Sequence, residues 1–152
     1  MKAEELMIGD LVLSTSISKP VRVIGIDPME GLGQREGYTF KLSDGKGMVL
    51  FVHAVSVKPI PLTDEMLTNW GFKKNKAGQW AIEKKHPIGC CGQTCSNTNP
   101  LEYAVWVDKY GYGCVSYLEK EGNLTISGPC YVHNLQHLLR IFGLDEYVKI
   151  EL

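Results

Sequence analysis

Three cysteines, Cys90, Cys91 and Cys95, lie close together in a segment rich in glycine, serine and asparagine. Thiolates are preferred zinc ligands, and His133 and His137, four residues apart, would share one face of a helix. However, Cys-Cys-x-x-x-Cys is not the usual spacing of a zinc knuckle, and no His-Glu-x-x-His motif is present. We therefore expect free thiols and neither a bound metal nor another cofactor.

A cysteine nucleophile is a second chemical hypothesis. Cys130 lies just before a predicted helix, where a thiol can have a lowered pKa, and His133 follows three residues later. Catalysis would also need an orienting group and an oxyanion site, and no sequence pattern predicts either. Cys114 and Cys130 are expected to be buried, as small apolar side chains. A zinc- or thiol-dependent enzyme is thus the weakest of the functional alternatives.

A lysine-rich hairpin is the third candidate. Basic residues interleaved with an aromatic ring can hold phosphates and stack on bases. The alternative is a solvated hairpin whose lysines prevent edge pairing, with the tryptophan in the core, and we favour it. The candidate nucleic-acid-binding residues are Lys73, Lys74, Lys76, Trp80, Lys84 and Lys85.

Two tyrosines are candidates for contact with a partner. Tyr110 and Tyr112 occupy a glycine-rich turn between two predicted strands, whereas Tyr103 and Trp106 lie within a strand. An aromatic ring in a turn is more exposed than one in a strand, and tyrosine is enriched at protein interfaces.

Residues 1–61 are predicted to form short strands separated by turns. Five such strands within about sixty residues favour a small, strongly bent barrel of the SH3-like kind. Pro59-Ile60-Pro61 cannot continue a strand ladder, so we place a subdomain boundary there. The expected strands are Leu11–Leu13, Val21–Ile26, Tyr38–Leu42, Met48–Val52 and Val55–Val57.

Residues 62–152 are predicted to form an α+β subdomain with an antiparallel sheet. Thr63 is expected to cap a short helix that ends at Gly71. Strands are expected at Phe72–Lys76, Gln79–Glu83, Tyr103–Val107, Cys114–Leu118 and Leu124–Ile126, and Tyr147–Leu152 could form another. An amphipathic helix is predicted before Gly143, with its buried stripe at Val132, Leu135, Leu139 and Phe142.

Composition limits the function classes further. The 152 residues include 44% hydrophobic and 22% charged side chains, which excludes global disorder. The net charge of −1 gives no global electrostatic case for binding nucleic acid or an anionic membrane. Neither a signal peptide nor a run of about 20 apolar residues is visible, so we expect a cytoplasmic protein without membrane contact.

Three segments carry a resemblance to a known family: KAEELMIGDLV near the start, VKPIPLTDEML followed by WGF, and YVHNLQHLLRIFG near the end. In these segments the chain resembles small uncharacterised proteins encoded by Bacteroides-type bacteria and their phage or mobile elements. The resemblance implies a mobile-element setting and no particular activity. The chain departs from the family pattern at residues 89–95 and at His137, and both departures argue against a shared cysteine–histidine site.

The favoured interpretation is a non-enzymatic accessory module that binds an unknown protein partner. Nucleic-acid binding through the barrel or the lysine hairpin is the alternative. An exposed apolar patch would favour a protein partner, whereas a continuous basic groove would favour nucleic acid.

Overall fold

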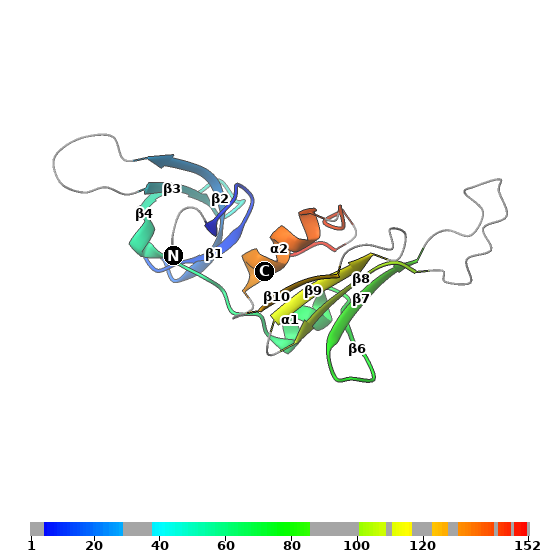
Figure 1. Ribbon diagram of the computed structural model, residues 1–152. Helices are drawn as coiled ribbons and strands as arrows, with labels where there is room; N and C mark the ends of the chain where they lie inside the picture. Colours follow the sequence, from blue (N-terminus) through cyan, green and yellow to red (C-terminus); the bar gives the residue numbers. More distant parts are fainter. Residues whose placement is uncertain are drawn as a thin grey trace.

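The computed structural model describes residues 5–28, 38–85, 101–108, 111–116, 123–127, 131–141, 143–146 and 148–151. Within these residues the chain has mixed α+β structure, and every strand pairing is antiparallel. One sheet is curled into a half-barrel, a second sheet is more open, and a helix lies between them (Figure 1).

The curled sheet has five strands in the order β4-β3-β2-β1-β5. The ten-residue strand β2 bends at a bulge between Val23 and Gly25, which helps the sheet to curl. Its concave side encloses a first core that includes Val12, Phe40 and Leu42. The strands are β1 (Leu11–Ser14), β2 (Lys19–Pro28), β3 (Tyr38–Ser43), β4 (Val49–His53) and β5 (Val57–Lys58).

The segment between β4 and β5 corrects the predicted strand at Val55–Val57. Ala54–Ser56 form a 3-10 helix, η2, and only Val57 and Lys58 pair with β1. In a strand, Val55 and Val57 would lie on the same face. Instead Val55 is 81% exposed and Val57 is buried, so the two valines do not share a buried face.

The second sheet also has five strands, in the order β10-β9-β8-β7-β6. It is preceded by α1 (Asp64–Asn69). Thr63 caps the start of this helix, and its Oγ1 accepts a hydrogen bond from the Met66 amide at 3.2 Å. Gly71 follows with a left-handed φ of +86°, so both predicted ends of this helix are confirmed. The strands are β6 (Lys73–Lys74), β7 (Trp80–Lys85), β8 (Leu101–Asp108), β9 (Gly111–Ser116) and β10 (Asn123–Ser127).

The C-terminal helix α2 (Val132–Ile141) buries the predicted stripe at Val132, Leu135 and Leu139. Phe142, the fourth predicted member, lies outside the described residues. The helix ends as expected: Gly143 has a φ of +61°, and the Leu144 amide donates to the Leu139 carbonyl at 2.7 Å.

The predicted last strand is wrong for the described residues 148–151, which pair with no strand. Val148 and Ile150 instead pack into the second core, and the Trp70 indole N–H donates to the Glu151 carbonyl at 3.0 Å. The alternation of apolar residues thus reflects docking onto α1 and α2 rather than sheet formation.

Strand β1 separates the two cores. Alternate side chains point to opposite faces of a strand, so Val12 enters the first core while Leu11 and Leu13 pack against the second. That second core combines α1, α2 and strand β8. Its buried members include Leu67, Trp70, Phe72, Val105, Val107, Leu135, Leu138 and Leu139.

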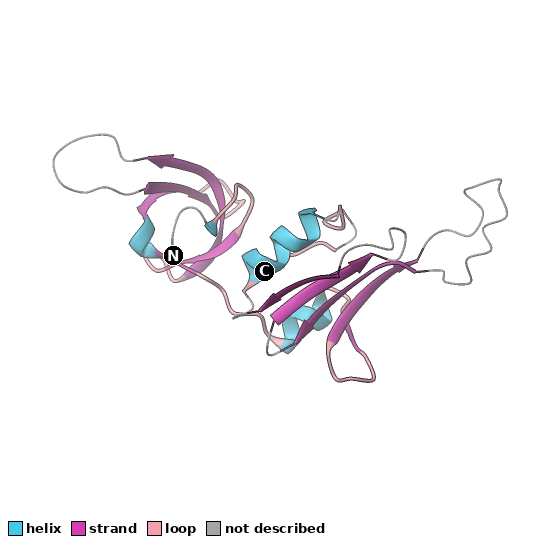
Figure 2. Cartoon of the chain, viewed as in Figure 1, coloured by secondary structure: helices cyan, strands magenta, loops and turns pink. Residues whose placement is uncertain are grey.

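The helices of the described chain are short (Figure 2). Within the described residues, none is long and apolar enough to cross a membrane.

Candidate functional site

The lysine hairpin holds its tryptophan in an intramolecular contact. Trp80 Nε1 donates to Asp64 Oδ1 at 2.9 Å, and Lys74 Nζ donates to Asp64 Oδ2 at 3.2 Å. The same Lys74 ammonium lies 4.9 Å from the centre of the Trp80 ring. Trp80 also packs partly against the second core. The indole N–H of Trp80 is therefore already bonded within the chain, and one face of its ring already carries a cation.

Lys73 and Lys76 make no hydrogen bond or ion pair with this contact among the described residues. Lys73 and Lys76 are exposed, on β6 and in the following turn. Lys84 and Lys85 belong to β7, but their side chains lie outside the described residues. No continuous basic groove can be assembled from the lysine side chains that are described.

The tyrosine and cysteine predictions fall largely outside the described part of the chain. Tyr112 lies in β9 opposite Val107 and Ile126, without a described side chain, and Tyr110 lies outside. Cys114 lies in β9 opposite Val105, whereas Cys90, Cys91, Cys95 and Cys130 are not described. Their thiol states and the expected lack of metal stay predictions.

A buried carboxylate joins the two ends of the chain. Asp10 is fully buried, and its Oδ2 accepts hydrogen bonds from the Met7 amide and from His137 Nε2, both at 2.7 Å. Its Oδ1 accepts from the Arg140 guanidinium at 2.9 Å. Two side chains of α2 thus converge on the turn before β1, and they offset the cost of burying a charge.

Backbone groups of the same turn complete this junction. The Leu11 amide donates to Gln136 Oε1 at 2.8 Å, and Gln136 Nε2 approaches the Gly9 carbonyl at 3.4 Å. Gly9 has a φ of +95°, and a Cβ atom there would lie 2.9 Å from Arg140 Nη2. Glycine is therefore required both for the turn and for the close approach of α2.

His133 lies one helical turn from His137 and is only 3% exposed. Its ring stacks on Tyr131 with centroids 5.8 Å apart, and its buried Nδ1 has no hydrogen-bond partner among the described residues. Burial lowers the pKa of His133 below its ordinary value; the charge of Asp10 opposes this, His137 adds to it, and Glu5 again opposes it.

The described residues around this junction show no further catalytic or metal-binding group. Among the described residues, neither histidine is hydrogen-bonded to a hydroxyl or thiol group, and no three potential ligands cluster around a metal position. The hydrogen bonds of the junction hold α2 against the start of β1. The sequence did not reveal it, because Gly9-Asp10 indicates only a turn and its helix partners lie about 127 residues away.

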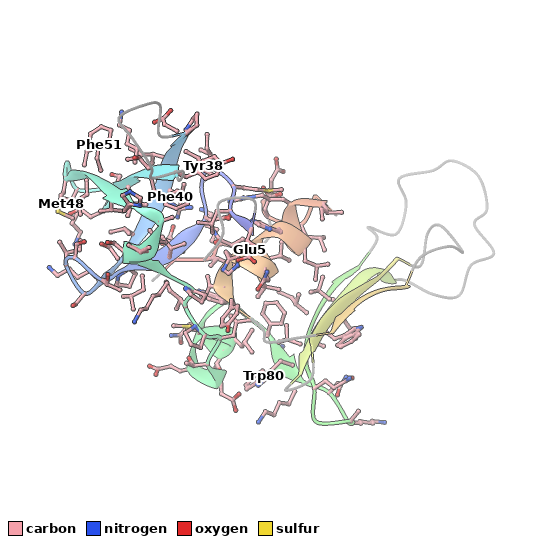
Figure 3. The ribbon with its side chains drawn as sticks, turned by 60° about the vertical axis from the view of Figure 1, so that its left-hand side comes forward. Glu5, Tyr38, Phe40, Met48, Phe51 and Trp80 are labelled. Carbon is pink, nitrogen blue, oxygen red and sulfur yellow. The ribbon has the colours of Figure 1, made fainter. Side chains whose placement is uncertain are left out.

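An apolar surface is exposed on strand β4. Val49 and Phe51 are 46% and 67% exposed, and their shared spacing places both on the convex face of the curled sheet. Phe51 points away from the barrel (Figure 3), with Lys41 Nζ 5.7 Å from its ring centre. We call Val49 and Phe51, with the exposed strand that carries them, the β4 surface.

Comparison of the chain with protein-family models, with curated proteins and with solved structures found no match in any of the three. No family is therefore assigned on those grounds. The best-defined features of the described residues are the apolar β4 surface and the polar Asp10 junction.

Proposed function

We propose that this chain is a non-enzymatic accessory module that binds another protein through the β4 surface. The observation that carries the proposal is the exposure of Phe51 at 67% on a terminal strand of the sheet. Strand β4 contains no lysine, arginine, aspartate or glutamate, although edge strands are usually protected by charge, proline or short length. Such an edge is suited to pairing with an extended segment of another chain.

The register of the curled sheet indicates the chemistry of the partner. Val49 lies opposite Ser43, which lies opposite Arg22; Phe51 lies opposite Lys41 in the next row. Phe51 thus has the Lys41 ammonium beside its ring, whereas Ser43 separates Val49 from Arg22. We infer a partner segment in extended conformation, with apolar side chains that cover Val49 and Phe51 and acidic side chains near Lys41.

Two finer assignments belong to this proposal. The strand order β4-β3-β2-β1-β5, with a bent second strand and a 3-10 turn before the last, supports an SH3-like barrel. A phage or mobile-element setting is supported by the resemblance of the three sequence segments alone.

The test compares two equally exposed apolar side chains. The wild-type protein, Phe51→Glu and Ile141→Glu are each used to capture partners from an extract of the producing organism, because Ile141 is 66% exposed on α2. A captured protein is then purified and its Kd measured. We expect Phe51→Glu to weaken binding by at least about tenfold and Ile141→Glu to leave it unchanged, with similar melting temperatures for all three proteins.

Other results would contradict the proposal. Equal loss of binding in both variants would show that Phe51 has no special role. A concentration-dependent dimer of the wild type, abolished by Phe51→Glu in sedimentation, would identify a second copy of the chain as the occupant instead.

A further inference from the structure

A pocket lies where the two ends of the chain meet, between β2, α2 and the C-terminal segment. Its volume is about 330 Å³, within the range of roughly 300–1,000 Å³ of small-molecule sites. Leu139, Val148 and Ile150 contribute apolar walls. The polar residues that line it are Arg22, Gln136, Arg140, Asp145, Lys149 and Glu151.

Two guanidinium groups approach the same point of the turn beside this pocket. Arg22 Nη1 donates to the Gly9 carbonyl at 2.7 Å. Arg140 Nη2 lies 2.9 Å from the position that a Cβ atom would take if Gly9 were replaced. Of the Arg140 nitrogens, only Nη1 donates to Asp10, whose side chain is fully buried. Both guanidiniums therefore retain N–H donors that no described residue uses.

A buried amide adds another donor. Gln136 is 6% exposed, and its Nε2 makes one long hydrogen bond, of 3.4 Å, to Gly9. An amide nitrogen carries two N–H groups, so one of them is available to a ligand. Guanidinium forks together with an amide donor are suited to oxyanions, which accept several hydrogen bonds in one plane or tetrahedron.

The other charged residues of the pocket limit the type of anion. Among the described residues, Arg22, Lys149, Asp145 and Glu151 form no ion pairs with one another although they line one pocket. A bare anion would meet the two carboxylates unfavourably, whereas a ligand with its own donors would satisfy them.

We propose that this pocket binds a small organic oxyanion, a carboxylate or a phosphate, that also carries hydroxyl or ammonium groups. The oxyanion lies between Arg22 and Arg140, and the donors face Asp145 and Glu151. This inference does not rest on the β4 surface, because neither Val49 nor Phe51 lines the pocket.

Binding is tested on the full-length protein with four probes. Ribose 5-phosphate and L-glutamine carry donors, whereas inorganic phosphate and acetate supply the bare oxyanions. The readouts are a Kd from titration calorimetry and shifts of the Gly9 backbone and Gln136 side-chain amide signals in NMR spectra. We expect one donor-bearing probe to bind, more tightly than its bare oxyanion, and the preferred probe identifies the ligand as a phosphate or a carboxylate.

Variants locate the site. Arg22→Ala should weaken binding roughly tenfold or more, and Arg22→Lys should restore only part of it because the fork is lost. Lys19→Ala, an exposed lysine on the same strand, is the matched control and should bind normally. Lys149→Ala provides an independent variant if Arg22→Ala fails to fold. The proposal would be overturned if no probe bound saturably up to roughly 10 mM. It would also be overturned if neither Arg22→Ala nor Lys149→Ala weakened binding, or if the bare oxyanions bound more tightly than the donor-bearing probes.

Discussion

At the scale of single residues, Asp10 is the side chain that joins the turn before β1 to α2. A fully buried carboxylate requires charged or polar partners, and three donors from two ends of the chain supply them. Replacing Asp10 by Ala leaves Arg140 and His137 without their acceptor at a partly buried site. We expect a loss of about 2–4 kcal/mol in the free energy of unfolding, measured by urea denaturation.

Asp145→Ala is the matched control, because Asp145 is exposed and forms no ion pair among the described residues. Its unfolding free energy should stay within about 0.5 kcal/mol of the wild type. Equal effects of the two substitutions would show that Asp10 does not hold α2 in place.

His133 makes stability depend on pH. Because burial lowers its pKa in the folded state, the unfolded chain binds more protons between that pKa and the ordinary value of about 6.5. Its contribution is complete above about pH 6.5 and is lost as the pH falls toward the folded pKa, by at most about 1.4 kcal/mol per pH unit. His133→Leu should flatten this decrease between about pH 7 and 5 in urea titrations. A variant with an unchanged slope would assign the pH dependence to other groups.

Residue roles could be predicted from the sequence where they need only near neighbours. Thr63 caps the start of a helix, and Gly71 and Gly143 follow the last turn of one. All three act through contacts within a turn or two, and each was identified correctly. The bond between Asp10 and His137 was not, because it joins residues 127 positions apart. Nothing local distinguishes a buried aspartate after a glycine from an exposed one in a turn.

At the scale of elements, the lysine hairpin was predicted correctly as a pair of strands, but the partners of its side chains were not. The strands and turn were predicted, but the acceptor for Trp80 and Lys74 comes from α1. With both side chains engaged, we expect no binding of a single-stranded oligonucleotide at physiological salt by fluorescence anisotropy. Tight binding that weakens steeply with salt and is lost in a Lys73→Ala, Lys74→Ala and Lys76→Ala variant would show this expectation to be wrong.

The two mistaken strands have a common physical cause. Periodicity reports which side chains avoid water, and a strand needs hydrogen-bonding neighbours as well. Val148 and Ile150 are buried against helices without such neighbours, and Val55 lies on a 3-10 turn. By contrast, the apolar stripe of α2 predicted burial correctly, because a helix satisfies its own backbone groups.

At the scale of the whole molecule, β1 belongs to both cores, and this links the stability of the two sheets. Val12 packs into the first core and Leu11 into the second, while Asp10 binds α2. The segment Pro59-Ile60-Pro61, where the boundary is predicted, also contacts α2, since the Ile60 carbonyl accepts a hydrogen bond from the Val132 amide at 2.9 Å. The predicted subdomains 1–61 and 62–152 should therefore unfold together.

The tryptophans allow this coupling to be measured. Trp70, Trp80 and Trp106 all lie after the boundary, so their fluorescence reports on the second sheet and its helices. Leu42→Ala removes a fully buried side chain from the first core, at a cost of about 2–5 kcal/mol. If the molecule unfolds as one unit, this substitution should shift the tryptophan transition in urea as far as the circular dichroism transition. Leu135→Ala, in the second core, should likewise shift both. A tryptophan transition that stays at the wild-type midpoint in Leu42→Ala would show that β1 does not couple the two halves.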